Sequence, residues 1–269
     1  MPRSSSADPR RSGADPKYPV PALDKGLDIL ELLAERPDGL TQAEVARSLG
    51  RSVGEIFRML NALLRRGYLA LDPHSDRYLL TLRLFELAHR HAPMNRLIWN
   101  ALPVMKDLSA EIRQSCHLAV LEQRRAVVVT QVDSPDEVCF AVRVGRDMDP
   151  LDTASGRVLL AFSSDGKRDE LLEELPARPR AAASSRLEQI RRRGYEQMPS
   201  TRIRGVHDVS VPVVGFGGGV VAALTVPCIE SIGEDRDTML EEVVAAVRRA
   251  GVALSRSIGG AVVQEESPS

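Results

Sequence analysis

Two helix-capping motifs lie close together in the segment Leu40–Arg66, and they constrain the fold more than any other feature of the chain. Thr41-Gln42-Ala43-Glu44 and Ser52-Val53-Gly54-Glu55 both have the form S/T-x-x-E. In this form the hydroxyl accepts from the backbone N–H three residues later, and the glutamate reaches back to the cap. Gly50 lies between them, where a helix ends in a left-handed turn. A short helix, a glycine turn and a longer Arg-rich helix predict a helix-turn-helix, whose usual partner is the major groove of DNA.

The flanking residues extend this motif into a winged domain. Apolar residues recur at helical spacing in Ala22–Leu33, and Gln42–Leu49 and Val53–Arg66 are the second and third helices. Tyr68–Leu71 and Arg77–Thr81 then enclose a polar turn, which is typical of a β-hairpin. Three helices followed by a hairpin predict a winged helix-turn-helix over residues 20–81.

The charge distribution favours a local DNA contact. The whole chain carries a net charge of −1 and has a pI of about 6.5, so it has no global basic field. Between Arg47 and Arg66, however, five arginines stand against one glutamate, which gives this stretch a net charge of +4. Because phosphate contacts set much of the affinity for DNA, such a patch suits a DNA-binding helix.

Early residues of the second helix of a helix-turn-helix face base edges. Arg58 can make the bidentate contact to guanine, and Glu55 can accept from a cytosine amine, although its capping role competes. Ile56 belongs to the core stripe, and the remaining basic residues suit phosphate contacts. A solvated helix face is the alternative for any single arginine. The candidate DNA-binding residues are Thr41, Gln42, Arg51, Ser52, Val53, Glu55, Arg58, Arg65, Arg66, His74 and Arg77.

The rest of the chain predicts a linker helix and an α+β domain with one central sheet. Residues 1–19 and 260–269 are expected to be solvated tails, residues 82–93 the linker helix and residues 94–259 the second domain. A kink or break is expected at Pro103 in the helix Trp99–Ile112. The strands expected here are Cys116–Leu121, Ala126–Val132, Val138–Val144, Val209–Val214 and Val220–Val226, and the helices are Thr153–Phe162, Lys167–Glu174, Arg186–Gly194 and Asp235–Ser257.

Several classes of protein are disfavoured. The three cysteines stand singly among apolar residues, so we expect buried, reduced thiols in a cytoplasmic protein. No apolar run approaches the ~20 residues of a membrane span. Gly215–Gly219 resembles a phosphate loop, but a β-alternating run follows it where a helix is required. Cys116-His117 and His207-Asp208 place neighbouring side chains on opposite faces of a strand, so neither is a catalytic dyad. We expect neither an enzyme nor a metal or cofactor site.

Three further blocks complete a resemblance to a known family. They are Leu151-Asp152-Thr153-Ala154-Ser155-Gly156-Arg157, the segment from Arg193-Gly194-Tyr195 to Gly205-Val206-His207-Asp208-Val209, and Ala222-Ala223-Leu224-Thr225-Val226. Together with the winged domain, they resemble the IclR family of bacterial transcriptional regulators over about Val20–Gly259. The resemblance implies a GAF/profilin-like effector-binding domain, which often takes a carboxylic or aromatic acid, and assembly as a dimer of dimers.

The resemblance also implies an effector site between the sheet and the helix that starts at the T-A-S-G block. Backbone N–H groups at such a helix start bind anions, which agrees with this placement. Asp208 stands where many relatives carry Cys, and Pro227 stands where some carry Ser. A carboxylate here would repel an anion unless Arg143 or His207 neutralises it or the effector carries a hydroxyl or cationic group. The implied effector-binding residues are Phe140, Met148, Ala154, Ser155, Met198, Val206, Asp208, Thr225 and Pro227.

The sequence therefore predicts a transcription factor that binds an operator as a homodimer and responds to a small effector. A winged-helix module for protein contacts without DNA binding is the main alternative. An enzyme with an accessory winged domain is a weaker one, because no nucleophile, base and orienting group converge in the sequence.

Overall fold

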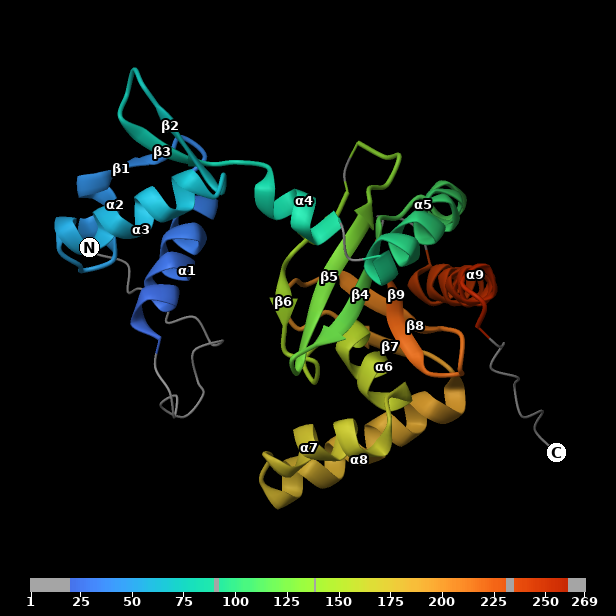
Figure 1. Cartoon of the computed structure of the whole chain (residues 1–269). Helices are drawn as coiled ribbons and strands as arrows, with labels where there is room; N and C mark the ends of the chain where they lie inside the picture. The colour runs from blue at the N-terminus through green and yellow to red at the C-terminus, as the bar shows by residue number, and fades with distance from the viewer. Residues whose placement is uncertain (1–19, 90–91, 138, 231–234, 261–269) are drawn as a thin grey trace. The chain divides into compact units, whose positions relative to one another are not determined.

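A computed structural model describes residues 20–89, 92–137, 139–230 and 235–260 of the 269-residue chain (Figure 1). The chain divides into two units, Met1–His91 and Ala92–Ser269. The finer division into residues 20–81, 82–93 and 94–259 stays a prediction. The two expected tails lie outside the described residues, apart from Gly260.

The first unit is the expected winged helix-turn-helix (Figure 1). A strand that the sequence did not predict, β1, pairs with β3 because the wing brings Tyr78 and Arg77 opposite Leu40 and Thr41. Two residues are too short to carry a strand periodicity. The elements are α1 (Pro21–Ala34), β1 (Leu40–Thr41), α2 (Gln42–Ser48), α3 (Val53–Arg65), β2 (Leu69–Asp72), β3 (Arg77–Leu80) and α4 (Arg83–His89).

One apolar core fixes the three helices of this unit against the wing. Ile29 of α1, Val45 of α2, and Ile56 and Leu60 of α3 are fully buried, and Tyr78 of β3 closes the cluster. Ile56 therefore faces inward, as the helical stripe predicted. The expected linker helix is α4, and residues 90–91 at its predicted end lie outside the described residues.

The second unit is built on one six-stranded antiparallel sheet, with strand order β6-β5-β4-β9-β8-β7. Helices α5 and α9 cover one face, and α6 with α7 and α8 lies on the other (Figure 1). The elements are α5 (Ala92–Ile112), β4 (Cys116–Glu122), β5 (Arg125–Val132), β6 (Asp147–Met148), α6 (Ala154–Phe162), α7 (Asp165–Glu173), α8 (Ala177–Arg193), β7 (Glu196–Pro199), β8 (Val206–Val214), β9 (Val220–Ile229) and α9 (Arg236–Ser257).

Three expectations for this unit were wrong, and a fourth was wrong in part. Helix α5 runs through Pro103 without a break, while Ala101, Met105 and Leu108 pack into the core; a kink at Pro103 stays a prediction. Residues 139–144 of the expected strand at Val138–Val144 form no strand, and Asp147–Met148 pairs with β5 instead; Val138 lies outside the described residues. Helix α8 begins nine residues earlier than expected, since Ala177–Arg186 is rich in the helix-forming residues Ala and Arg rather than amphipathic. Cys139 is exposed, whereas Cys116 and Cys228 are buried as expected.

The sheet is also larger than expected. Strand β7 was not predicted, β8 begins at Val206 rather than Val209, and β9 continues to Ile229. These added residues form cross-strand pairs: Met198 lies opposite Asp208, and Asp208 lies opposite Pro227. The pairing depends on a partner strand that is distant in the sequence, which a local periodicity cannot reveal.

Candidate nucleic-acid interface and effector site

The two capping boxes form as predicted, and they set where α2 and α3 begin. The Thr41 hydroxyl accepts from the Glu44 N–H at 3.4 Å, while the Glu44 carboxylate accepts from the Thr41 N–H at 2.9 Å. The Ser52 hydroxyl accepts from the Glu55 N–H at 3.4 Å, and Glu55 accepts from the Ser52 N–H at 3.2 Å. Each box satisfies two backbone donors that a helix start leaves open.

The Glu55 carboxylate is engaged at both oxygens. Oε1 accepts from the Lys25 ammonium of α1 at 2.6 Å, and Oε2 accepts from Ser52. The hydrogen bonds from Lys25 and Ser52 lower the pKa of Glu55 to about 2. This carboxylate therefore ties α1 to the start of α3, and the predicted cytosine contact loses its support.

The solvent-facing side of α3 presents basic and apolar side chains together. Arg58 and Arg65 are exposed, at a spacing that places them on one face of the helix. Val53 is 52% exposed, and Phe57, one turn later, is 51% exposed. Phe57 was not among the predicted contacts. Its position outside the buried stripe that includes Ile56 could have indicated that its side chain is exposed. Apolar side chains in this place can contact thymine methyl groups.

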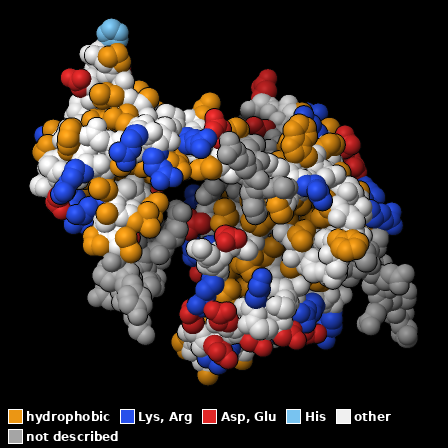
Figure 2. Space-filling view, viewed as in Figure 1, with side chains coloured by type: hydrophobic (Ala, Val, Ile, Leu, Met, Phe, Trp, Pro, Cys, Tyr) orange, Lys and Arg blue, Asp and Glu red, His pale blue; other side chains and the backbone are white. Residues whose placement is uncertain are grey.

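The predicted phosphate contacts fall into two groups. Arg51, Arg65 and Arg66 are exposed, and within the described part of the chain no carboxylate lies at ion-pairing distance from them. Figure 2 shows several Lys and Arg side chains on one side of this unit. Arg77, in contrast, donates to the Gly39 carbonyl at 2.9 Å and to Glu44 at 3.1 Å, so it joins the wing to α2.

The remaining predicted residues lie at the edges of this surface. Gln42 donates its side-chain amide to the Val53 carbonyl at 3.1 Å, which links α2 to α3. His74 is exposed in the turn between β2 and β3, where its N–H donates to Asp72.

In the second unit, helix α6 begins with two buried N–H groups. Thr153 is the N-cap, and its hydroxyl accepts from the Gly156 N–H at 3.2 Å. Ala154 and Ser155 are 1% and 2% exposed, and among the described residues neither N–H group donates to a side chain or to a carbonyl outside the helix. A Cβ at Gly156 would lie 2.3 Å from Pro150, so only glycine permits this close approach. The helix start is a ready site for an anionic group.

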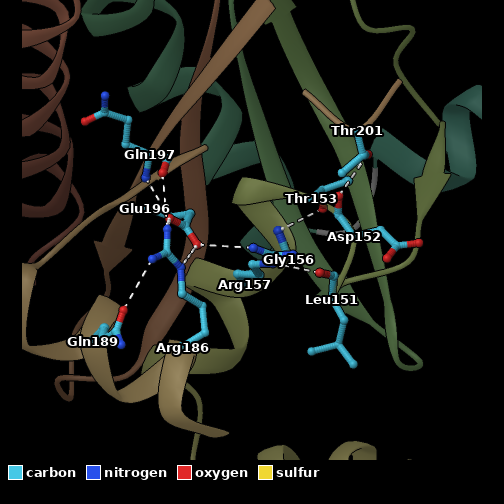
Figure 3. A network of polar contacts seen from close by, with 10 residues as sticks. All are labelled: Leu151, Asp152, Thr153, Gly156, Arg157, Arg186, Gln189, Glu196, Gln197 and Thr201. Carbon is cyan, nitrogen blue, oxygen red and sulfur yellow. Dashed lines mark hydrogen bonds and ion pairs between the residues drawn. The ribbon is translucent and has the colours of Figure 1, made fainter. Parts of the chain in front are cut away.

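A buried charge network anchors the first turn of α6 to strand β7 (Figure 3). Glu196 is 1% exposed and accepts from Arg186 of α8 at 2.5 and 3.0 Å. Arg157 of α6 lies 3.6 Å from the same carboxylate. On the neighbouring loop, the Thr201 hydroxyl donates to the Asp152 carbonyl at 3.2 Å. The start of α6 is therefore held over β7 and its partner β8. No local pattern predicted this network, because it joins residues that are distant along the chain.

The register brings most of the implied effector residues onto one sheet face. Met198, Asp208 and Pro227 are cross-strand neighbours on β7, β8 and β9, and Thr225 is two residues from Pro227. Thr225 shares a 2.8 Å hydrogen bond with Ser210. Val206 and Met148 are buried, at the start of β8 and in β6. Phe140, half-buried in the irregular segment before β6, belongs to no strand.

Burial raises the pKa of Asp208 to about 6. Neither of the two cations considered as its partner forms an ion pair with it within the described part of the chain. The His207 ring lies 3.2 Å from Glu230, and Arg143 is exposed in the irregular segment. Two hollows on this unit, of about 670 Å³ at the ends of α5 and α9 and about 400 Å³ at α7 and α8, are lined by none of the implied effector residues.

Among the described residues, no helix combines the length and the apolar character of a membrane span. The same residues contain no group of three or more His, Cys, Asp and Glu side chains placed to hold a metal ion.

Comparisons with known proteins agree with this architecture. The chain is 28% identical over 248 residues to the transcriptional regulator XynR of Escherichia coli (strain K12), covering 89% of this chain and 98% of XynR. It is 30% identical over 251 residues to KdgR of the same organism, covering 89% and 93%. An IclR homologue from Microbacterium hydrocarbonoxydans, solved with 4-hydroxybenzoate, has the same fold, with a TM-score of 0.74 at 24% identity over 88% of this chain and 98% of that one.

The family matches cover both units. Residues 22–73 match the IclR helix-turn-helix domain, and residues 92–256 match the bacterial transcriptional regulator IclR C-terminal family. Both are families of transcriptional regulators and not of enzymes. With a DNA-binding winged unit and a C-terminal effector domain, the chain belongs to the IclR family of bacterial transcriptional regulators.

Proposed function

We propose that this regulator binds an operator in duplex DNA as a homodimer, under the control of a small carboxylic or aromatic acid bound in the second unit. The observation that carries the proposal is the exposed face of α3. Arg58 and Arg65 lie there without an ion-paired carboxylate among the described residues, next to exposed Val53. Such a face suits a helix that enters the major groove.

Contacts to DNA divide by chemistry. Ser52, Val53 and Arg58 are assigned to base edges, because they occupy the first turns of α3. The exposed residues Arg51, Arg65, Arg66 and His74 are assigned to the phosphate backbone, with Thr41 and Gln42 at its margin. Glu55 and Arg77 keep their structural roles, since both side chains are already bonded within the unit.

Dimerisation follows from the geometry of duplex DNA. One helix-turn-helix reads one half-site, and two recognition helices must be about 34 Å apart to enter successive major grooves. We extend the proposal to a dimer of dimers acting in the cytoplasm, where bacterial DNA lies. Light scattering of the protein with and without DNA measures the stoichiometry.

The effector site comprises the nine residues implied by the family resemblance, from Phe140 to Pro227. Two features support an acid as its ligand. The N–H groups of Ala154 and Ser155 are buried at a helix start, where a carboxylate is stabilised. A structural homologue was solved with 4-hydroxybenzoate, which is such an acid. Titration of keto acids into the wild type and Asp208→Asn tests the role of Asp208, and tight, identical binding to both would remove it from the site.

Control of DNA binding requires that the effector bind one state of the protein more tightly than the other. By linkage, an effector that weakens DNA binding by a given factor must itself bind less tightly by the same factor in the presence of DNA. Titrations of each ligand with the other at saturation measure both factors.

Salt-dependent binding to duplex DNA from the upstream region of its own gene tests the DNA-binding face. We expect the logarithm of affinity to fall steeply with that of salt concentration, and Arg65→Ala to reduce the slope by about 0.9. Arg192→Ala, an exposed arginine of α8, is the matched control and leaves the slope unchanged. Absence of binding even at low salt would instead favour the protein-interaction module.

A further inference from the structure

The sheet carries a row of polar side chains on the face that α6 covers. The row consists of cross-strand neighbours, one from each of the strands β5, β4, β9, β8 and β7; we call it the central polar row. Its members are Gln131, His117, Thr225, Ser210 and Glu196. Ala119 and Ala223, two residues from His117 and Thr225, pack in the core on the α6 side, and side chains two residues apart share a face.

Three members of this row are satisfied within the protein. Ser210 and Thr225 bond to each other at 2.8 Å, and Glu196 binds its two arginines. His117 is different. Its side chain is 95% buried, yet neither ring nitrogen has a hydrogen-bond partner within the described part of the chain. The Oε1 atom of its neighbour Gln131 is also buried without a partner.

Unsatisfied buried polar atoms are rare in folded proteins, and each needs an explanation, such as a role in binding a ligand, a water or an ion. Leaving one buried donor or acceptor without a partner costs about 1–3 kcal/mol. Here three such atoms belong to two cross-strand neighbours, His117 and Gln131, and His117 is itself the cross-strand neighbour of Thr225 of the effector site. Their clustering indicates one missing partner rather than three independent defects.

We propose that His117 is a specificity-determining residue that binds a hydroxyl group of the effector, and that the effector is a hydroxy-monocarboxylic acid. Its carboxylate lies at the N–H groups of Ala154 and Ser155. This inference rests on the proposed effector function and names the ligand class for that site.

Charge supports one carboxylate rather than two. Arg157 and Arg186, the cations near the start of α6, both form ion pairs with Glu196, so their guanidinium groups are already engaged within the protein. Asp208 adds negative character on the same face. The N–H groups at the start of α6 are therefore the remaining place for a single anionic group. A ligand with one carboxylate and an otherwise neutral body suits these charges, and a hydroxyl group can bond to unpartnered donors and acceptors.

The chemistry of His117 fits a hydroxyl. Burial lowers the pKa of His117 to about 4, so the ring is neutral at neutral pH. A neutral imidazole has one N–H donor and one acceptor nitrogen. A hydroxyl group donates and accepts, so it can bond to the ring whichever nitrogen carries the proton. The free Oε1 of Gln131 offers a second acceptor at the same place.

Sheet geometry sets the length of the ligand. The start of α6 is anchored at β7 and β8 through Glu196 and Thr201. His117 lies on β4, which is two strands from β8. Adjacent strands are about 4.8 Å apart, so β4 and β8 are about 10 Å apart across the sheet. A small aromatic or six-carbon acid with its hydroxyl at the end remote from the carboxylate spans this distance.

Paired acids that differ only in the hydroxyl test the proposal on the full chain. The probes are 4-hydroxybenzoate with benzoate, and 6-hydroxyhexanoate with hexanoate, titrated by calorimetry. We expect at least one hydroxy acid to bind the wild type about tenfold more tightly than its partner, as a buried hydrogen bond allows. In His117→Leu this ratio should fall to about 1, and His117→Asn should restore part of it. His207→Leu, a histidine paired with Glu230, is the control and keeps the ratio.

A ligand-free measurement separates recognition from a structural role. Because His117→Leu removes unsatisfied buried nitrogens, we expect its melting temperature without effector to equal or exceed that of the wild type. A clearly lower melting temperature would mean that the ring is held by ordered water only, and would overturn the proposal. Two-bond ¹H–¹⁵N spectra add a direct readout: the ring nitrogens of His117, assigned by their absence from His117→Leu, should shift with the hydroxy acid and not with its partner.

Two other results would also refute the inference. Equal ratios in the wild type and His117→Leu would exclude a hydroxyl contact at His117. If neither hydroxy acid bound, the ligand class would be wrong. The DNA titration on the same preparation shows whether the proposed regulatory function stands, because steep, salt-dependent DNA binding does not depend on either result.

Discussion

Replacing Asp208 with Asn should stabilise the second unit, and more so at high pH. The pKa of Asp208 rises from an ordinary 3.8 to about 6 through burial. Because the folded-state value lies above the unfolded one, the wild type loses stability as pH rises through this interval. At about 1.36 kcal/mol per pKa unit, the loss approaches about 3 kcal/mol at pH ~8 and about half of that at pH ~5. Asn has a similar shape and no charge, so the substitution should raise the free energy of unfolding by up to these amounts.

Urea unfolding followed by tryptophan fluorescence measures this change in the relevant unit. Trp99 is the only tryptophan of the chain and lies in α5 of the second unit. Protein concentration must be equal in all samples, since association shifts apparent stability. The free energy of unfolding of Asp208→Asn should exceed that of the wild type by a margin that grows from pH ~5 to pH ~8.

Asp235→Asn is the matched control. Hydrogen bonds from Thr238 at the start of α9 lower the pKa of Asp235, so its contribution is present above its unfolded value of 3.8 and fades only in stronger acid. This variant should therefore change stability by a similar amount at both pH values. If Asp208→Asn showed the same pH-independent behaviour, or were no more stable than the wild type, burial of a costly charge at Asp208 would be refuted.

Three further predictions concern other parts of the chain. Ser52→Ala removes a helix cap and should destabilise the first unit by about 1 kcal/mol, measured by far-UV circular dichroism during heating. Glu196→Gln leaves two arginines without their carboxylate and should cost about 2 kcal/mol by tryptophan fluorescence, whereas the exposed Glu174→Gln should cost little. Phe57→Ala should weaken binding to a thymine-containing operator about fourfold, because the loss of one methyl contact costs about 0.8 kcal/mol. Replacing thymine by deoxyuridine should affect the wild type more than this variant, and equal effects would exclude the contact.

Local sequence accounts for most of the first unit. The capping boxes predicted where α2 and α3 begin, because their hydrogen bonds join residues three apart. The inward stripe at Ile56 followed from helical periodicity, and its burial is complete. The role of Arg77 did not follow, because its partners Gly39 and Glu44 lie more than thirty residues away.

The second unit shows where local patterns fail. The valine-rich Val138–Val144 segment has strand-like composition, but residues 139–144 form no strand, because β5 pairs with Asp147–Met148 instead. Strand β7 is short and polar at one end, so its sequence shows no strand periodicity. Its pairing with β8 is visible only in the folded sheet. Sheet membership depends on partners, and partners are chosen by the whole fold.

By itself, the sequence determined the winged helix-turn-helix, the helix predicted at Thr153–Phe162 and the family to which the chain belongs. All of these depend on contacts within a few residues or on blocks in a fixed order. Only the tertiary structure decided that Glu196 would be buried between two arginines and that His117 would lie buried without a partner beside Thr225. Burial and hydrogen-bond satisfaction depend on segments that the sheet brings together. They therefore cannot be predicted from the spacing of residues along the chain.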